Sequence, residues 1–77
     1  MEQKIKQDEI FIGQNIRRIR KEKGIWQTEM VALMQLQNVP VTREALVKIE
    51  KGIQHIQALQ LRAIRNLLET TYDELLK

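Results

Sequence analysis

Apolar residues recur at helical spacing near the start of the chain. Ile12, Ile16 and Ile19 follow the i, i+4, i+7 pattern of one helix face. Gly24 comes after this pattern and is a typical C-terminal stop, because glycine adopts a left-handed backbone conformation without strain. The pattern predicts a helix over residues 9–23 that buries one face.

A second helix is predicted over residues 27–37, which are rich in strong helix formers. Met30 and Met34 lie on one line of this helix and are its predicted core residues. Asn38 can take a left-handed conformation at the helix end, and Pro40 lacks the amide hydrogen that a helix needs. The chain must therefore turn directly after the second helix.

The third predicted helix begins at Thr42, whose hydroxyl is a typical N-cap, and runs to Lys51. Gly52 follows as a C-terminal stop. The apolar residues at helical spacing in this segment are Leu46, Ile49 and Ile53.

A fourth helix is predicted over residues 58–69. Thr71, with Glu74 three residues later, has the spacing of a capping box, which opens a short fifth helix over residues 72–77. The apolar face of the fourth helix consists of Leu61, Ile64 and Leu68.

Five predicted helices cover most of the 77 residues, and a chain of this length has room for one hydrophobic core. We expect an all-α fold with one domain over residues 9–77, preceded by a mobile N-terminal arm over residues 1–8. No apolar run approaches the ~18 residues of a membrane span, and the chain contains no cysteine. These features predict a soluble protein of the cytoplasm.

The net charge of +3 is modest, but its distribution is uneven. Residues 13–52 carry eight basic and four acidic side chains, whereas the segments on either side are close to balanced. A basic segment is typical of a surface that contacts phosphate groups, and also of an ordinary solvated helix face. Charge alone leaves both interpretations open.

The third predicted helix presents a polar face once its apolar residues point to the core. The outward residues are Arg43, Glu44, Val47, Lys48 and Lys51. Arginine and lysine donate to guanine O6 and N7, and glutamate accepts from cytosine N4, with about 1–3 kcal/mol of discrimination for each good pair. Two helices joined by a short turn, the second with such a face, are typical of a helix-turn-helix that contacts duplex DNA.

Other side chains are candidates for contact with the DNA backbone. Gln27 begins the second predicted helix, where free backbone N–H groups favour a phosphate oxygen. The first helix carries Arg17, Arg18, Lys21 and Lys23, which add sequence-independent attraction where they lie near phosphates. All of these side chains are also common on ordinary solvated surfaces.

Three segments resemble the phage repressor and Cro-type (Xre-like) helix-turn-helix DNA-binding family. They are IGQNIRRIRKEKGIWQTEM (12–30), TREALVKIEKG (42–52) and TTYDELL (70–76). The resemblance implies a compact five-helix, lambda-repressor-like domain. It also implies a sequence-specific, repressor-like transcriptional regulator of bacteria or phages that binds a double-stranded DNA operator as a homodimer.

The resemblance assigns roles by position. Arg43, Glu44 and Lys48 match the residues that face base edges, and Gln27 matches a glutamine that binds phosphate. Thr42 and Ala45 match positions near the DNA backbone or a thymine methyl group. With Arg17 and Lys51, which charge and helix face suggest, the expected contacts with the DNA backbone are Gln27, Thr42, Ala45, Arg17 and Lys51.

Arg20 and Glu50 match a pair that forms a partly buried salt bridge between the first and third helices of related repressors. Removing one partner of a buried pair costs about 3–5 kcal/mol, because the other charge is left without a partner. We therefore expect both residues to be structural, although both are charged.

Two departures from the family pattern bear on the expected DNA contacts. The stretch over residues 27–52 is several residues longer than usual, so the reach of Arg43 and Glu44 does not transfer directly. Trp26 stands where a serine or threonine N-cap is usual. It either covers the core between the first two helices, which we favour, or packs on a sugar-phosphate strand or a partner.

A second apolar line runs beside the predicted core face of the fourth helix. Leu59, Ala63 and Leu67 form this line, and together with Leu76 they are the expected homodimer interface. The alternative is that the leucines are ordinary exposed residues, which are common on protein surfaces.

The residues give no basis for an enzyme. The chain has no serine or cysteine, His55 is its single histidine, and its three glycines lie apart instead of forming a phosphate-binding loop. We expect no catalytic residue, cofactor, metal, membrane or small-molecule ligand. The competing function is a protein-interaction module of the same fold, such as an antitoxin or anti-repressor, which Glu44 and the low net charge leave open.

Overall fold

The computed structural model describes residues 4–5 and 11–77 of the chain, with the backbone alone at residues 4–5. The described helices are α1 (Ile12–Glu22), α2 (Gln27–Leu36), α3 (Arg43–Glu50), α4 (Ala58–Leu68) and α5 (Tyr72–Leu75). The described strands are β1 (Lys4–Ile5) and β2 (Ile56–Gln57). Apart from this short strand pair, the described residues form the all-α fold that the sequence predicts.

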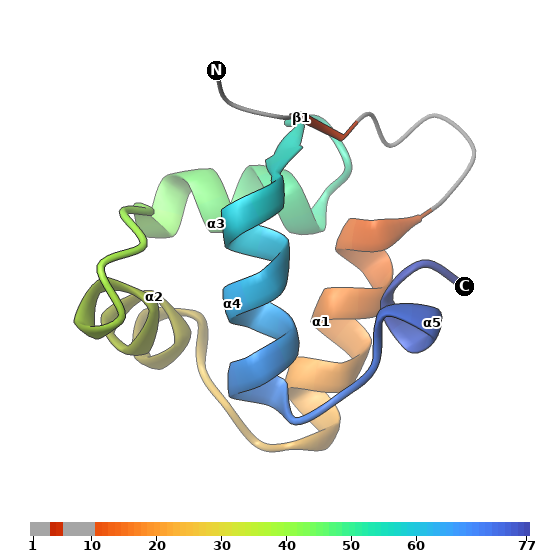
Figure 1. Ribbon diagram of the computed structural model, residues 1–77, viewed down its shortest axis with the longest axis horizontal. Helices are drawn as coiled ribbons and strands as arrows, with labels where there is room; N and C mark the ends of the chain where they lie inside the picture. The colour runs from red at the N-terminus through yellow and green to blue at the C-terminus, as the bar shows by residue number, and fades with distance from the viewer. Residues whose placement is uncertain (1–3, 6–10) are drawn as a thin grey trace.

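The helices enclose one core from several directions. In Figure 1, α3 crosses behind α4, with α2 towards one side and α1 and α5 towards the other. α1 and α2 both contact α3, and both also contact α4. α1 and α2 therefore hold α3 in place from two directions.

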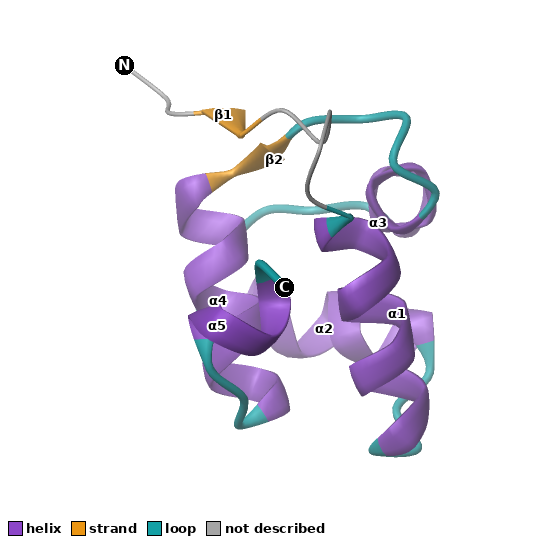
Figure 2. Ribbon diagram, turned by 90° about the vertical axis from the view of Figure 1, so that its right-hand side faces the viewer, coloured by secondary structure: helices purple, strands orange, loops and turns teal. Residues whose placement is uncertain are grey.

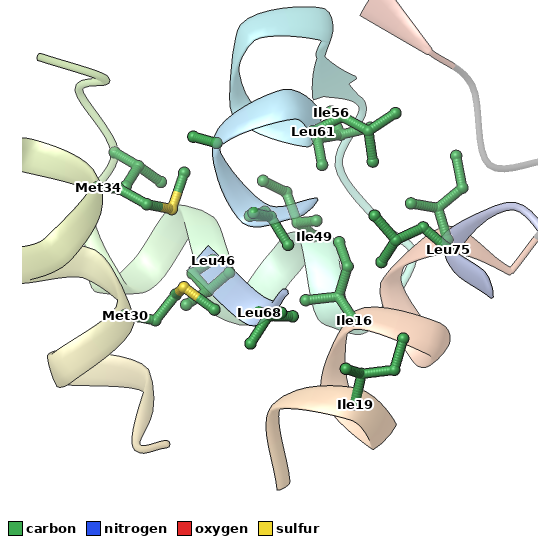
Figure 3. Close-up of a cluster of buried hydrophobic side chains, with 14 of the residues drawn as sticks. Ile16, Ile19, Met30, Met34, Leu46, Ile49, Ile56, Leu61, Leu68 and Leu75 are labelled. Carbon is green, nitrogen blue, oxygen red and sulfur yellow. The ribbon is translucent and has the colours of Figure 1, made fainter. Parts of the chain in front are cut away.

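Side chains from all five helices meet in this core. Figure 3 shows Ile16 and Ile19 from α1, Met30 and Met34 from α2, and Leu46 and Ile49 from α3 pointing towards one another. The predicted apolar faces of α1 to α4 are buried as expected, whereas Ile53 is exposed because the chain turns at Gly52 before reaching it. None of the described helices combines the length and apolarity that a membrane crossing requires.

Capping residues account for the helix ends. The hydroxyls of Thr42 and Thr71 accept hydrogen bonds from the amides three residues later, at 3.0 and 3.1 Å, and so begin α3 and α5. Gly24, Asn38 and Gly52 have φ values of 71°, 61° and 78° and follow the ends of α1, α2 and α3. The predicted breaks between these helices are confirmed.

Helix boundaries differ from the predictions at several ends. α1 begins at Ile12, after Phe11 with a non-helical ψ of 62°, and residue 9 lies outside the described residues. α4 ends one residue early, because Glu69 takes a left-handed conformation with φ 52° and the Thr70 amide then donates to the carbonyl of Arg65 at 3.1 Å. α5 ends at Leu75 instead of at residue 77.

A strand pair joins the N-terminal segment to the start of α4. β1 pairs antiparallel with β2, with Lys4 opposite Gln57 and Ile5 opposite Ile56. Figure 2 shows this pair at the N-terminal end of α4. The sequence does not predict this contact within the arm expected over residues 1–8, and the rest of that arm lies outside the described residues.

Candidate nucleic-acid interface

The exposed face of α3 carries the residues expected to face base edges. Arg43, Glu44 and Lys48 are exposed, whereas Leu46 and Ile49 on the opposite face are fully buried. The 3.6-residue period of the helix separates the two sets. α3 therefore presents a polar surface with charges of both signs on an element that the core holds in place.

An open hollow lies beside the N-terminal end of α3. Residues from α1, from the turn after it, and from the starts of α2 and α3 line it: Arg17, Arg20, Lys21, Gly24, Ile25, Trp26, Gln27 and Arg43. Four of these lining residues are basic and none is acidic. The hollow is therefore a site of positive potential that favours an anion.

The charges of the hollow are not equally available. Arg20 is neutralised by a buried carboxylate, whereas Arg17, Lys21 and Arg43 form no ion pair with any other described residue. Arg18, which the sequence grouped with them, instead pairs with Glu22 at 3.3 Å outside the hollow. Three exposed cations therefore remain to attract an anionic partner.

Arg20 and Glu50 form a two-point ion pair between α1 and α3. Arg20 Nε donates to Glu50 Oε2 at 2.8 Å and Nη2 donates to Oε1 at 2.9 Å. The two side chains are only 7% and 2% exposed. Arg20 Nη1 also donates to the carbonyl oxygen of Ile25 at 2.7 Å, so one guanidinium connects α1, α3 and the turn that leads into α2.

Gln27 is tied to the same carboxylate. Its Nε2 donates to Glu50 Oε1 at 3.1 Å, and its side chain is half-buried. A primary amide has two N–H groups, so one N–H remains for a further acceptor. The sequence gives no signal for this contact, because the two residues are 23 positions apart and on different helices.

The other expected backbone contacts lie around α3. Thr42 is exposed, and its hydroxyl accepts the Ala45 amide while keeping its own hydrogen for a further acceptor. Ala45 is half-buried and packs against the core, so its methyl group is only partly accessible. Arg17 lies in the hollow at the N-terminal end of α3, and the exposed Lys51 is the C-cap at the other end.

The exposure of Trp26 contradicts the expectation that its side chain covers the core. Trp26 is 76% exposed and so does not cover the core between α1 and α2. Ile25, one residue earlier, packs against that core instead. The Trp26 amide donates to Glu29 Oε1 at 3.4 Å, but no described side chain accepts from the first amides of α2 as a serine or threonine hydroxyl would.

The expected dimer interface is wrong at Ala63. Ala63 is only 4% exposed and belongs to the core, and Leu67 is half-buried against it. The physical reason is that α1 and α2 both pack on α4, and Ala63 belongs to the core that the helices share. Of the expected interface, only Leu59 and Leu76 are exposed.

Comparison with protein-family models, with curated proteins and with solved structures finds no match to this chain. Within residues 11–77, no group of three or more histidine, cysteine, aspartate or glutamate side chains is placed to hold a metal ion. The function of the surface is therefore inferred from the exposure, charge and hydrogen bonds of its residues.

Proposed function

We propose that the protein is a sequence-specific regulator that binds double-stranded DNA through a lambda-repressor-like helix-turn-helix domain of the phage repressor and Cro type. In this proposal α2 and α3 are the two helices of the motif, and α3 enters the major groove. The observation that supports it most is the combination of a polar face on α3 with a hollow at its N-terminal end, where Arg17, Lys21 and Arg43 form no ion pair with another described residue. An α-helix with its side chains is about 10–12 Å wide, and the major groove is about 12 Å wide.

Each exposed residue has a distinct part in this proposal. Arg43, Glu44 and Lys48 contact base edges, because they occupy the outward face of α3. Arg17 and Lys21 contact phosphates without regard to sequence, because they line the hollow beside that face. Gln27, the amides at the start of α2 and Thr42 supply further hydrogen bonds to the DNA backbone.

The proposal includes a homodimer that acts in the cytoplasm, where bacterial and phage DNA is transcribed. Two-fold symmetry in the protein would match an operator with two similar half-sites about one helical turn apart. Leu59 and Leu76 are the exposed apolar residues that remain from the expected interface.

Duplex binding is expected to weaken with salt in proportion to the number of phosphate contacts. Arg17→Ala and Lys21→Ala should each reduce the steepness of the plot of log association constant against log salt concentration by about 0.9. Each variant removes one phosphate contact that displaces a counterion. The measurement is fluorescence anisotropy of a labelled mixed-sequence duplex over a series of potassium chloride concentrations.

Arg62→Ala is the matched control for these variants. Arg62 is exposed on α4 outside the hollow, and its loss changes the net charge by the same amount. Its slope should equal that of the unmodified protein. A slope that falls equally in all three variants would contradict the assignment of the hollow, because net charge alone would then explain the effect.

A protein-interaction module is the second candidate, and specific side chains favour it. Leu36 at the end of α2 is 80% exposed, Ile53 after α3 is also exposed, and Glu44 places a negative charge on α3. Exposed apolar residues of this size are common at protein interfaces. Failure to bind any duplex at low salt would favour this candidate, since electrostatic binding is strongest there.

A further inference from the structure

Trp26 is a large exposed side chain on a rigid part of the backbone. Its carbonyl accepts the Met30 amide at 2.9 Å, and its own amide donates to Glu29 Oε1 at 3.4 Å. The residue is 76% exposed. The side chain is therefore presented outwards from the first residue before α2, and none of the contacts described so far uses it.

The surroundings of Trp26 restrict the chemistry of a partner. Trp26 lines the same hollow as Arg17, Lys21 and Arg43, and no acidic side chain lines it. The indole Nε1–H is a donor only, so it needs an acceptor, while the ring needs an apolar surface. A nucleic-acid strand offers both, because phosphate acceptors alternate with deoxyribose rings along it.

We propose that Trp26 contacts the DNA backbone, with its indole ring against a deoxyribose and its Nε1–H donating to a phosphate of the strand beside the start of α2. This inference rests on the proposed function. Arg43 belongs both to the hollow and to the outward face of α3, so the hollow adjoins the face that would enter the groove. In a duplex the bases are stacked inside, which leaves the sugar-phosphate strand as the surface that Trp26 would meet.

The fluorescence of the unmodified protein tests the contact directly. Trp26 is the single tryptophan of the chain, so indole emission reports this position alone. Titration with an unlabelled mixed-sequence duplex at low salt should change the emission. The change should saturate with the same Kd that anisotropy of a labelled duplex gives.

A Trp26→Ser variant separates this contact from the contacts of the neighbouring cations. Serine supplies a hydroxyl cap to α2, which favours a folded variant. Duplex affinity should fall by roughly fivefold or more, the scale of truncating an important interface tryptophan. The fall should be equal for mixed-sequence and selected duplexes, because a backbone contact carries no base information. The salt slope should stay unchanged, because no charge is removed.

Leu36→Ser is the matched control. It replaces an exposed large apolar residue at the opposite end of α2 from Trp26, outside the hollow, and duplex affinity should not change. Thermal unfolding followed by circular dichroism checks that both variants are folded. If Trp26→Ser does not fold, the titration of the unmodified protein decides the question without it.

Several outcomes would overturn the proposal, and they are distinguishable. If the unmodified protein binds duplex DNA without an emission change, and Trp26→Ser binds equally well, then Trp26 is not a contact and the proposed function stands. If the unmodified protein binds no duplex, both fail. If poly-glutamate, or a rise in protein concentration alone, changes the emission as DNA does, Trp26 serves an acidic protein or a second copy of this chain instead.

Discussion

Replacing Arg20 with alanine is expected to lower the free energy of unfolding by about 3–5 kcal/mol, out of the roughly 5–15 kcal/mol that a domain usually has. The variant removes both charged hydrogen bonds to Glu50, whose carboxylate is 2% exposed and would keep only the amide of Gln27. The carbonyl of Ile25 also loses its donor. Urea unfolding followed by circular dichroism measures the loss.

Arg18→Ala is the control for this prediction. Arg18 lies two residues earlier on α1, and its ion pairs with Glu22 and Glu74 are exposed, so its loss should cost about 0–1 kcal/mol. Arg20→Met combined with Glu50→Leu should be more stable than Arg20→Ala, because no charge is then left buried without a partner. Equal stability of the Arg18→Ala and Arg20→Ala proteins would show that the buried pair is not structural.

Replacing Arg43 and Lys48 together with alanine is expected to remove most of the sequence selectivity of DNA binding, because Glu44 is then the one remaining side chain of the three that we propose to contact base edges. Each good contact between a basic side chain and a base is worth about 1–3 kcal/mol, so the pair would contribute about 2–6 kcal/mol where the effects add. Both side chains are exposed on α3, and neither forms an ion pair with another described residue, so the fold should be retained. The measurement compares the Kd for a selected duplex with the Kd for a mixed-sequence duplex.

The ratio of the Kd for the mixed-sequence duplex to the Kd for the selected duplex measures the sequence selectivity. In the double variant it should approach one, because binding through the phosphate contacts of Arg17 and Lys21 remains. Arg62→Ala combined with Lys77→Ala removes the same charge from exposed positions outside the hollow and should preserve the ratio. A double variant of Arg43 and Lys48 that keeps full selectivity would exclude α3 as the helix that contacts bases.

Local features of the sequence were sufficient to predict the helices. The spacing of Ile12, Ile16 and Ile19 reports which face of α1 is buried, because a helix repeats every 3.6 residues wherever it packs. Thr42 caps the start of α3, and Gly52 allows the turn at its end. Both effects involve only nearby backbone groups, so they can also be predicted from the sequence. The exposed face of α3 follows from the same periodicity.

Features that depend on tertiary contacts were not predictable in this way. The burial of Ala63 depends on α1 and α2 both covering α4. Trp26 is exposed, whereas its neighbour Ile25 packs against the core, and residue type alone does not distinguish these two positions. Glu69 takes a left-handed conformation that its residue type does not favour, in a turn where the Thr70 amide satisfies a carbonyl of α4.

The bond between Gln27 and Glu50 joins residues on separate helices, as does the Arg20–Glu50 pair. The Arg20–Glu50 pair could be predicted only from the resemblance to a known family. Nothing in the sequence predicts the contact between Gln27 and Glu50. Together these bonds hold the start of α2 against the end of α3. The position of the hollow relative to α3 therefore depends on a buried network, while its positive charge is visible in the sequence itself.

Selection of bound sites from a pool of random duplex DNA tests the central claim most directly. The protein is expected to enrich one sequence made of two similar half-sites about one helical turn apart, and enrichment of that sequence should be much weaker in the Arg43→Ala, Lys48→Ala double variant. Failure to enrich any sequence at low salt, or equal enrichment of the same sequence by the double variant, would contradict the account.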